Sequence, residues 1–257
     1  MKIGFRTATF YKWGLDRTLQ TLAQAGYDGV DIALEHPDTN PILLKDPQKV
    51  DQVRRMIADA GLELVAVSWH IGCNPESISH TMDIAQQMGA NLVITNGDPI
   101  PLAGAKAEWP RTVERIRKLA ELAEKKGLIL ALEPDFVPGF TIASSAEFER
   151  LADEVDSPCL KLNLDINHAA ISDDDFLASI RRLRQYLVGL HLSDSRNRVH
   201  EHLIPGQGEL DWLQIRSTLD EIGFDGYCVI DIFDDFDTPG RTATESLQAL
   251  KRMWNMK

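Results

Sequence analysis

Short apolar runs of strand length recur along the whole chain, and amphipathic segments separate them. The runs are rich in Val, Ile and Leu, which is typical of parallel strands covered on both faces. Segments such as Leu15–Gly26 and Asp46–Gly61 show a helical pattern that ends in glycine, and SSAEFERLADEV starts from a serine cap. Eight strands are expected, at Lys2–Ala8, Gly29–Glu35, Leu62–Ser68, Asn91–Asn96, Leu128–Glu133, Leu160–Asp165, Leu187–Leu192 and Tyr227–Phe233.

The alternation of strands and helices predicts a parallel sheet, because right-handed crossovers return each strand beside its predecessor. Eight nearly even units of about 30 residues favour closure into a barrel. An open doubly wound sheet would normally show a glycine-rich phosphate turn after the first strand, and Arg6-Thr7-Ala8-Thr9-Phe10 is no such turn. We therefore expect an α/β fold, a single (β/α)8 TIM barrel, with one domain over residues 1–257.

Composition narrows the class of partner. The chain has 27 basic and 39 acidic residues, a formal charge of −12, which argues against binding nucleic acid because that affinity comes largely from Lys and Arg. Three scattered cysteines, with no CxxC pair, suggest neither a disulfide framework nor a thiolate zinc site. The sequence opens directly on a strand and contains no long apolar span, so we expect a cytoplasmic protein that does not enter a membrane.

Polar residues interrupt the apolar runs at the ends of four consecutive strands. Glu133 closes the fifth strand and Asp165 the sixth, while His191 and Asp231 lie near the ends of the seventh and eighth. In a barrel these ends meet at one mouth. Burying three carboxylates together is costly unless a cation compensates them, so the four residues predict a site for one divalent metal ion. Three oxygen ligands and one imidazole suit Mn²⁺, Mg²⁺, Co²⁺ or Zn²⁺, and Mn²⁺ is the ion we expect.

The same strand ends fall in segments that resemble the xylose isomerase-like superfamily. This group includes sugar isomerases, keto-sugar 3-epimerases, inosose dehydratases and isomerases, and type IV apurinic endonucleases. The resemblance extends over essentially the whole chain and is most specific in LALEP, LNLDINH, GLHLSD, HLIPGQGELDW and VIDIF. It implies that Glu133, Asp165, His191 and Asp231 are the metal ligands. Asp231 departs from the family, which has Glu there, so its carboxylate is one methylene shorter.

Histidines near the sixth and seventh strands are further candidates. His168 matches a family histidine that contacts substrate oxygens or a second metal, and we expect a catalytic role in orienting or polarising a substrate oxygen. His200 and His202 resemble the DxH segment of the apurinic endonucleases, but the first position is His rather than Asp. We interpret His202 as a loop or substrate-binding residue.

Other polar and aromatic residues follow the strands at the same rim. His70 and Trp69 come at the end of the third strand, Asn96 at the end of the fourth and Arg6 near the end of the first. Each is expected to contact substrate, with Trp69 stacking on the apolar face of a sugar or else packing beneath a loop. Such residues are common on barrel rims, so each prediction holds only if the side chain points into the mouth of the barrel.

The resemblance, together with these residues, implies a metal-dependent sugar isomerase or epimerase acting on a keto-sugar or sugar phosphate. A metal that binds a carbonyl acidifies the neighbouring C–H, and Glu133 and Asp231 would move the proton through an enediolate. Relatives that epimerise at C3 carry a further glutamate where this chain has Pro138, and Asp135 could replace it only if its loop turns inward.

Three alternatives stay open. The first is an inosose-type dehydratase or another keto-sugar lyase, which would use the same ligands. The others are a noncatalytic sugar-binding barrel and an apurinic endonuclease, the last disfavoured by the acidic charge. The expected partner is a small carbohydrate, and a homodimer is possible for a barrel of this kind.

Overall fold

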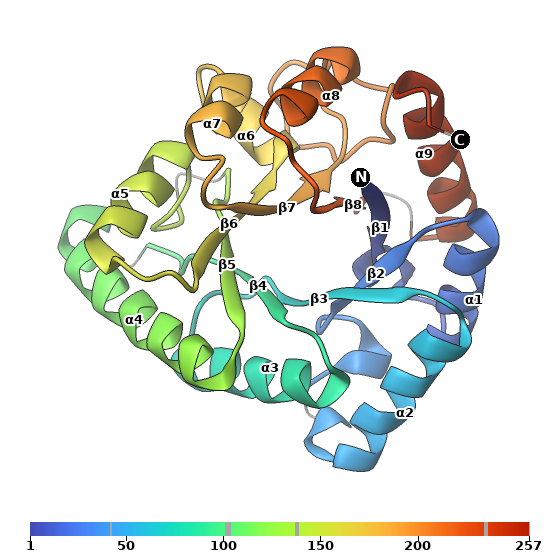
Figure 1. Ribbon diagram of the computed structural model, residues 1–257, viewed down its shortest axis with the longest axis horizontal. Helices are drawn as coiled ribbons and strands as arrows, with labels where there is room; N and C mark the ends of the chain where they lie inside the picture. The colour runs from blue at the N-terminus through green and yellow to red at the C-terminus, as the bar shows by residue number, and fades with distance from the viewer. Residues whose placement is uncertain (42, 101–103, 137–138, 234–235, 257) are drawn as a thin grey trace.

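The computed structural model describes residues 1–41, 43–100, 104–136, 139–233 and 236–256. Its centre is a closed barrel of eight parallel strands, which pair in chain order and close between β8 and β1 (Figure 1). This arrangement confirms the predicted (β/α)8 barrel. The strands are β1 (Lys2–Arg6), β2 (Gly29–Ala33), β3 (Glu63–Trp69), β4 (Leu92–Asn96), β5 (Ile129–Glu133), β6 (Leu160–Asp165), β7 (Leu187–Leu192) and β8 (Tyr227–Ile230).

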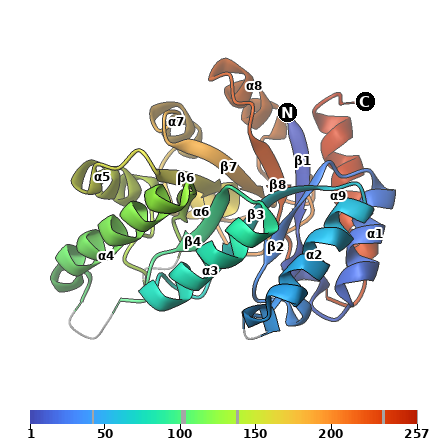
Figure 2. The ribbon, with the colours of Figure 1, turned by 60° about the horizontal axis from the view of Figure 1, so that its bottom comes forward.

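Helices surround the barrel and cover its outer face (Figure 2). Their caps follow the predicted signals: Gly26 ends the first helix in the left-handed region at φ 93°, and the Ser144 side chain accepts a hydrogen bond from the backbone N–H of Glu147. None of the described helices is long and apolar enough to span a bilayer. The helices are α1 (Leu15–Ala25), α2 (Pro47–Asp59), α3 (Pro75–Met88), α4 (Ala105–Lys126), α5 (Ser145–Val155), α6 (Ile166–Ser172), α7 (Phe176–Arg182), α8 (Trp212–Glu221) and α9 (Pro239–Met253).

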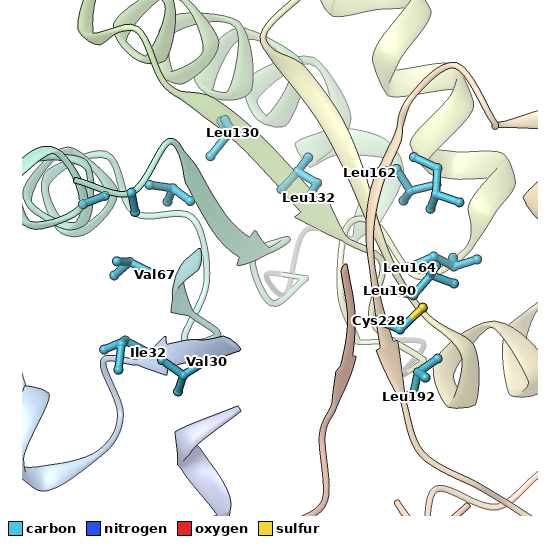
Figure 3. Packing of buried hydrophobic residues seen from close by; sticks show 14 of the residues in the cluster. Val30, Ile32, Val67, Leu130, Leu132, Leu162, Leu164, Leu190, Leu192 and Cys228 are labelled. Carbon is cyan, nitrogen blue, oxygen red and sulfur yellow. The ribbon is translucent and has the colours of Figure 1, made fainter. Parts of the chain in front are cut away.

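Alternate residues of each strand pack outward against the helices. Figure 3 shows part of this layer, with pairs such as Leu130 and Leu132 on β5 and Leu190 and Leu192 on β7. Successive side chains of a strand point to opposite faces. The residues between and after these leucines, including His191 and Glu133, therefore point into the barrel. There, side chains from the carboxyl ends of different strands can come together.

Several strand ends differ from the sequence prediction. β2 ends at Ala33 instead of Glu35, and β3 ends at Trp69 instead of Ser68. β1 ends at Arg6 instead of Ala8 because Thr7–Phe10 turns into a 3₁₀ helix. β8 ends at Ile230, so Asp231 follows the strand instead of lying within it. The backbone N–H of Asp231 still donates to the Leu192 carbonyl at 3.0 Å, which keeps Asp231 beside β7 and directs its side chain to the mouth.

Candidate metal centre

The four predicted ligands come together at the carboxyl end of the barrel. Glu133 ends β5, Asp165 ends β6 opposite His191 on β7, and Asp231 follows β8. All four are buried. The Nδ1 atom of His191 lies 2.8 Å from Glu133 Oε2 and 3.7 Å from Asp231 Oδ2. Neighbouring strands thus deliver three carboxylates and one imidazole to one point.

The polar atoms of this cluster are short of protein partners. Among the described residues, Asp165 Oδ2, Asp231 Oδ1 and both ring nitrogens of His191 are buried without a hydrogen bond. One potential ligand atom from each of Asp165, His191 and Asp231 lies within 4.8 Å of the others, and Glu133 forms a similar group with Asp165 and His168. Buried polar atoms normally have partners. Converging atoms without them, of the oxygen and imidazole types that divalent ions accept, fit a metal site.

Charges within the cluster are strongly coupled. Burial alone would raise the pKa of Glu133, but the neighbouring imidazoles, His191 first, outweigh it and hold that pKa well below its usual range. Burial alone would lower the pKa of His191, but the nearby carboxylates, Glu133 first, raise that pKa well above its ordinary value. In the metal-free protein, His191 is therefore protonated, and its positive charge takes the place of the ion's among the carboxylates.

Arg6 lies buried beneath the mouth, where acidic side chains surround it. Its Nη2 donates to Glu35 Oε2 at 2.9 Å, and its Nη1 lies 3.6 Å from Asp231 Oδ1. Burial works to lower the pKa of Arg6, but the carboxylates, led by Glu35, raise it. This fully charged side chain balances part of the negative charge. It is not among the residues that line the cavity described below. Its contact with substrate therefore stays a prediction, and we propose a positioning role in addition.

His70 connects Arg6 to Glu133. The Arg6 Nη2 lies 2.8 Å from His70 Nδ1, and because a guanidinium only donates, Nδ1 accepts and the His70 proton lies on Nε2. That Nε2 is 3.4 Å from Glu133 Oε2. Asn163 donates to the same Glu133 oxygen at 2.6 Å from inside the barrel. Asn163 therefore orients Glu133 through a hydrogen bond, while His70 Nε2 faces the same oxygen without forming one. Asn163 was not anticipated from the sequence.

His168, His200 and His202 form a group of imidazoles above the ligands. His168 Nε2 is 3.3 Å from His200 Nε2 and 3.4 Å from His202 Nε2. His168 and His202 each direct Nδ1 to a backbone carbonyl, of Pro134 at 3.2 Å and of Asp231 at 2.9 Å. Their Nε2 atoms consequently face one another, and the three rings are a second group that could hold a metal ion.

The pKa values of the two rings at the cavity differ in direction. Burial lowers the pKa of His200 to about 3, with the neighbouring imidazoles adding to the effect. Burial also works against a proton on His168, but Asp165 and then Glu133 outweigh it and raise the pKa of His168. At neutral pH His200 is therefore neutral, whereas His168 retains a proton more readily than a free histidine.

A cavity of about 180 Å³ opens over the cluster. The rings of Phe136 and His200 stack with centroids 3.8 Å apart on one part of its wall. Asp135 also lines the cavity, so its loop does turn inward, and Pro138 lies outside the described residues. The lining comprises His70, Asn96, Glu133, Asp135, Phe136, His168, His200, Asp231 and Phe233.

Only some of the predicted substrate contacts line this cavity. His70 and Asn96 line it, and Asn96 also accepts a hydrogen bond from the backbone N–H of Gly72 at 2.8 Å. Trp69 packs against the hydrophobic core and His202 is buried, and neither is among the described residues that line the cavity. Phe136 and Phe233 were not anticipated, because aromatic residues in loops have no periodic signal that reveals their orientation.

Comparison with known proteins places this barrel in a family of enzymes. The model of the xylose isomerase-like TIM barrel family matches residues 19–253, and the chain belongs to that family. A D-psicose 3-epimerase of Ruminiclostridium cellulolyticum is 31% identical over 129 residues, which span 50% of this chain but only 42% of that protein. An inosose dehydratase of Geobacillus thermodenitrificans is 24% identical over 86% of this chain and 82% of its own length.

A solved structure supports the same fold. The IolI protein with a bound zinc atom superimposes with a TM-score of 0.86 at 20% identity, covering 99% of this chain and 98% of that one. At this identity the likeness establishes the fold alone. The family match, with sugar epimerases and inosose dehydratases among the relatives, identifies the chain as an enzyme of this superfamily.

Proposed function

We propose that this protein is a divalent-metal-dependent sugar isomerase or epimerase, with one ion held by Glu133, Asp165, His191 and Asp231. The observation that favours this function is that only two of the four predicted ligands reach the cavity. Glu133 and Asp231 line the cavity, whereas Asp165 and His191 do not. The first two therefore have access both to the ion and to a bound substrate, as proton-transferring groups require.

The two carboxylates approach the cavity from different sides, because β6 and β7 separate β5 from β8 in the barrel. The ion, when bound, supplies a Lewis acid that polarises a substrate carbonyl. Glu133 is kept ionised by its neighbours, so its carboxylate can accept the proton on the carbon beside that carbonyl. Asp231 gives the resulting enediolate, from the other side, a proton that it has taken from water, and Glu133 then releases the abstracted proton to water. His168 donates to or orients a substrate oxygen.

The cavity favours a small, uncharged substrate. Its volume of about 180 Å³ lies below the roughly 300–1,000 Å³ typical of pockets for drug-sized ligands. No Lys or Arg is among its described lining residues, and the depressed pKa of His200 keeps that ring neutral. We infer an unphosphorylated keto-monosaccharide, with Phe136 and Phe233 against its apolar faces, as in the stacking of sugars on aromatic rings.

Dehydration of an inosose is the second candidate. It is favoured by the raised pKa of His168 at the cavity wall, because a protonated imidazole can transfer its proton to a departing hydroxyl group. The inosose dehydratase relative, matched over 86% of this chain, adds to this reason. Both reactions begin with the same proton abstraction.

Exchange of substrate hydrogen with solvent deuterium separates the possibilities. Manganese-loaded protein is incubated in D₂O with unphosphorylated ketoses, their phosphates and inososes, and products are followed by NMR. We expect deuterium at the carbon beside the carbonyl of one unphosphorylated ketose, together with its epimer or aldose isomer, and loss in Glu133→Gln of about 10²–10⁴-fold. A dehydrated product identifies the second candidate, and no exchange with any compound contradicts the proposal.

A further inference from the structure

A fourth buried carboxylate lies beside the predicted ligands. Asp31 is in the middle of β2, and its side chain is fully buried. Neither of its oxygens has a hydrogen-bond partner among the described residues. The nearest positively charged or protonatable atoms are His191 Nε2 at 3.3 Å from Asp31 Oδ2 and Arg6 Nε at 3.9 Å.

An acidic residue is a costly choice at this position. Its strand neighbours Val30 and Ile32 belong to the outer hydrophobic layer (Figure 3), so Asp31 points into the barrel. An apolar side chain there would avoid the desolvation of a carboxylate that no hydrogen bond compensates. Packing therefore gives no reason for an acid, and the contact with His191 is the feature that does.

The two nitrogens of His191 face different groups. Nδ1 is directed to the ligand side, 2.8 Å from Glu133 Oε2, and Nε2 to Asp31. A histidine that binds a metal through one nitrogen carries its proton on the other, and that N–H normally meets a carboxylate or carbonyl, which fixes the tautomer and the ring orientation. Asp31 lies where this acceptor is needed.

We propose that Asp31 is a positioning residue that accepts the Nε2 proton of His191 and keeps Nδ1 directed at the ion. The proposal rests on the proposed metal centre. Asp31 also adds a negative charge one layer below the ligands, and Arg6 offsets that charge from the β1 side, paired most closely through Nη2 with Glu35. Asp31 does not line the cavity, so it acts on substrate only through His191.

Manganese affinity of Asp31→Asn tests this role. Isothermal titration of metal-free protein with Mn²⁺ should give one ion per chain for wild type and for the variant, with binding about 10–100-fold weaker in the variant, as for other residues that orient a metal-binding histidine. Asp28→Asn is the matched control: Asp28 lies just before β2, is exposed, and its Oδ2 accepts from the backbone N–H of Ile3 at 2.8 Å. Its affinity should equal that of wild type.

The outcomes distinguish the inference from the function on which it rests. A wild type that takes up no Mn²⁺ contradicts the metal centre itself, whereas equal affinity in wild type and Asp31→Asn contradicts only the role of Asp31. If the variant does not fold, long-range ¹H–¹⁵N spectra of zinc-loaded wild type give the answer. We expect His191 to be protonated at Nε2, and protonation at Nδ1 overturns the proposal.

Discussion

Metal binding should release a proton from His191. The carboxylates around it raise its pKa well above the ordinary value in the metal-free protein, and an ion must displace that proton to bind Nδ1. Glu133 is already ionised because its pKa is held low. We therefore expect one proton to leave for each ion bound, and most of that release to come from His191.

The affinity for the metal ion should therefore depend on pH. A proton bound at low pH competes with the ion, so affinity rises with pH and levels off once the pH exceeds the pKa of His191. Below that point each pH unit changes the dissociation constant about tenfold, or about 1.4 kcal/mol. Over two units the effect is about 100-fold.

Calorimetric titration with Mn²⁺ in two buffers of different ionisation enthalpy measures the released protons directly, and repeating it across pH gives the slope. His191→Gln should bind the ion more weakly and with a flatter pH dependence. A wild-type affinity that does not change with pH, together with no proton release, would refute the assignment of a protonated His191 at the centre.

Three further changes test neighbouring parts of the site. Arg6→Met should lower the free energy of unfolding of the metal-free protein by about 3–5 kcal/mol in urea titrations, because it removes the cation buried among several carboxylates. Unchanged stability would contradict that balance. Asp231→Glu, which installs the longer family residue beside Arg6, should cost about 1–3 kcal/mol through overpacking, also measured in urea. His200→Ala should leave manganese at one ion per chain, as in wild type, and raise KM. Two ions per wild-type chain, one of which the variant loses, would indicate a second ion among the three histidines.

Sequence periodicity sufficed for the architecture because each strand is covered on both faces. A strand such as Leu187–Leu192 is a nearly continuous apolar run, and its polar exception, His191, marks the inner face. The exact ends could not be predicted in the same way. Thr7–Phe10 looks like a continuation of β1 in composition, but its backbone turns into a 3₁₀ helix.

The candidate site was predictable only at the strand ends. Glu133 and His191 could be brought together by topology alone, since parallel strands in a barrel end at one mouth. Asp31 lies in the middle of β2, so a search for polar residues at strand ends does not find it. The acid within the apolar run GVDIAL is nevertheless a signal in the sequence. Phe136 and Phe233 depend on loop conformation, which hydrophobic periodicity does not encode.

The metal content of the purified protein tests the central claim most directly. Elemental mass spectrometry on protein prepared without added metal, and again after Mn²⁺ addition and removal of excess, should find about one ion per wild-type chain. Asp165→Asn should hold markedly less, and because Asp165 does not line the cavity, that loss reflects the ion and not substrate contacts. Wild-type protein that neither contains nor takes up a divalent metal would contradict the account.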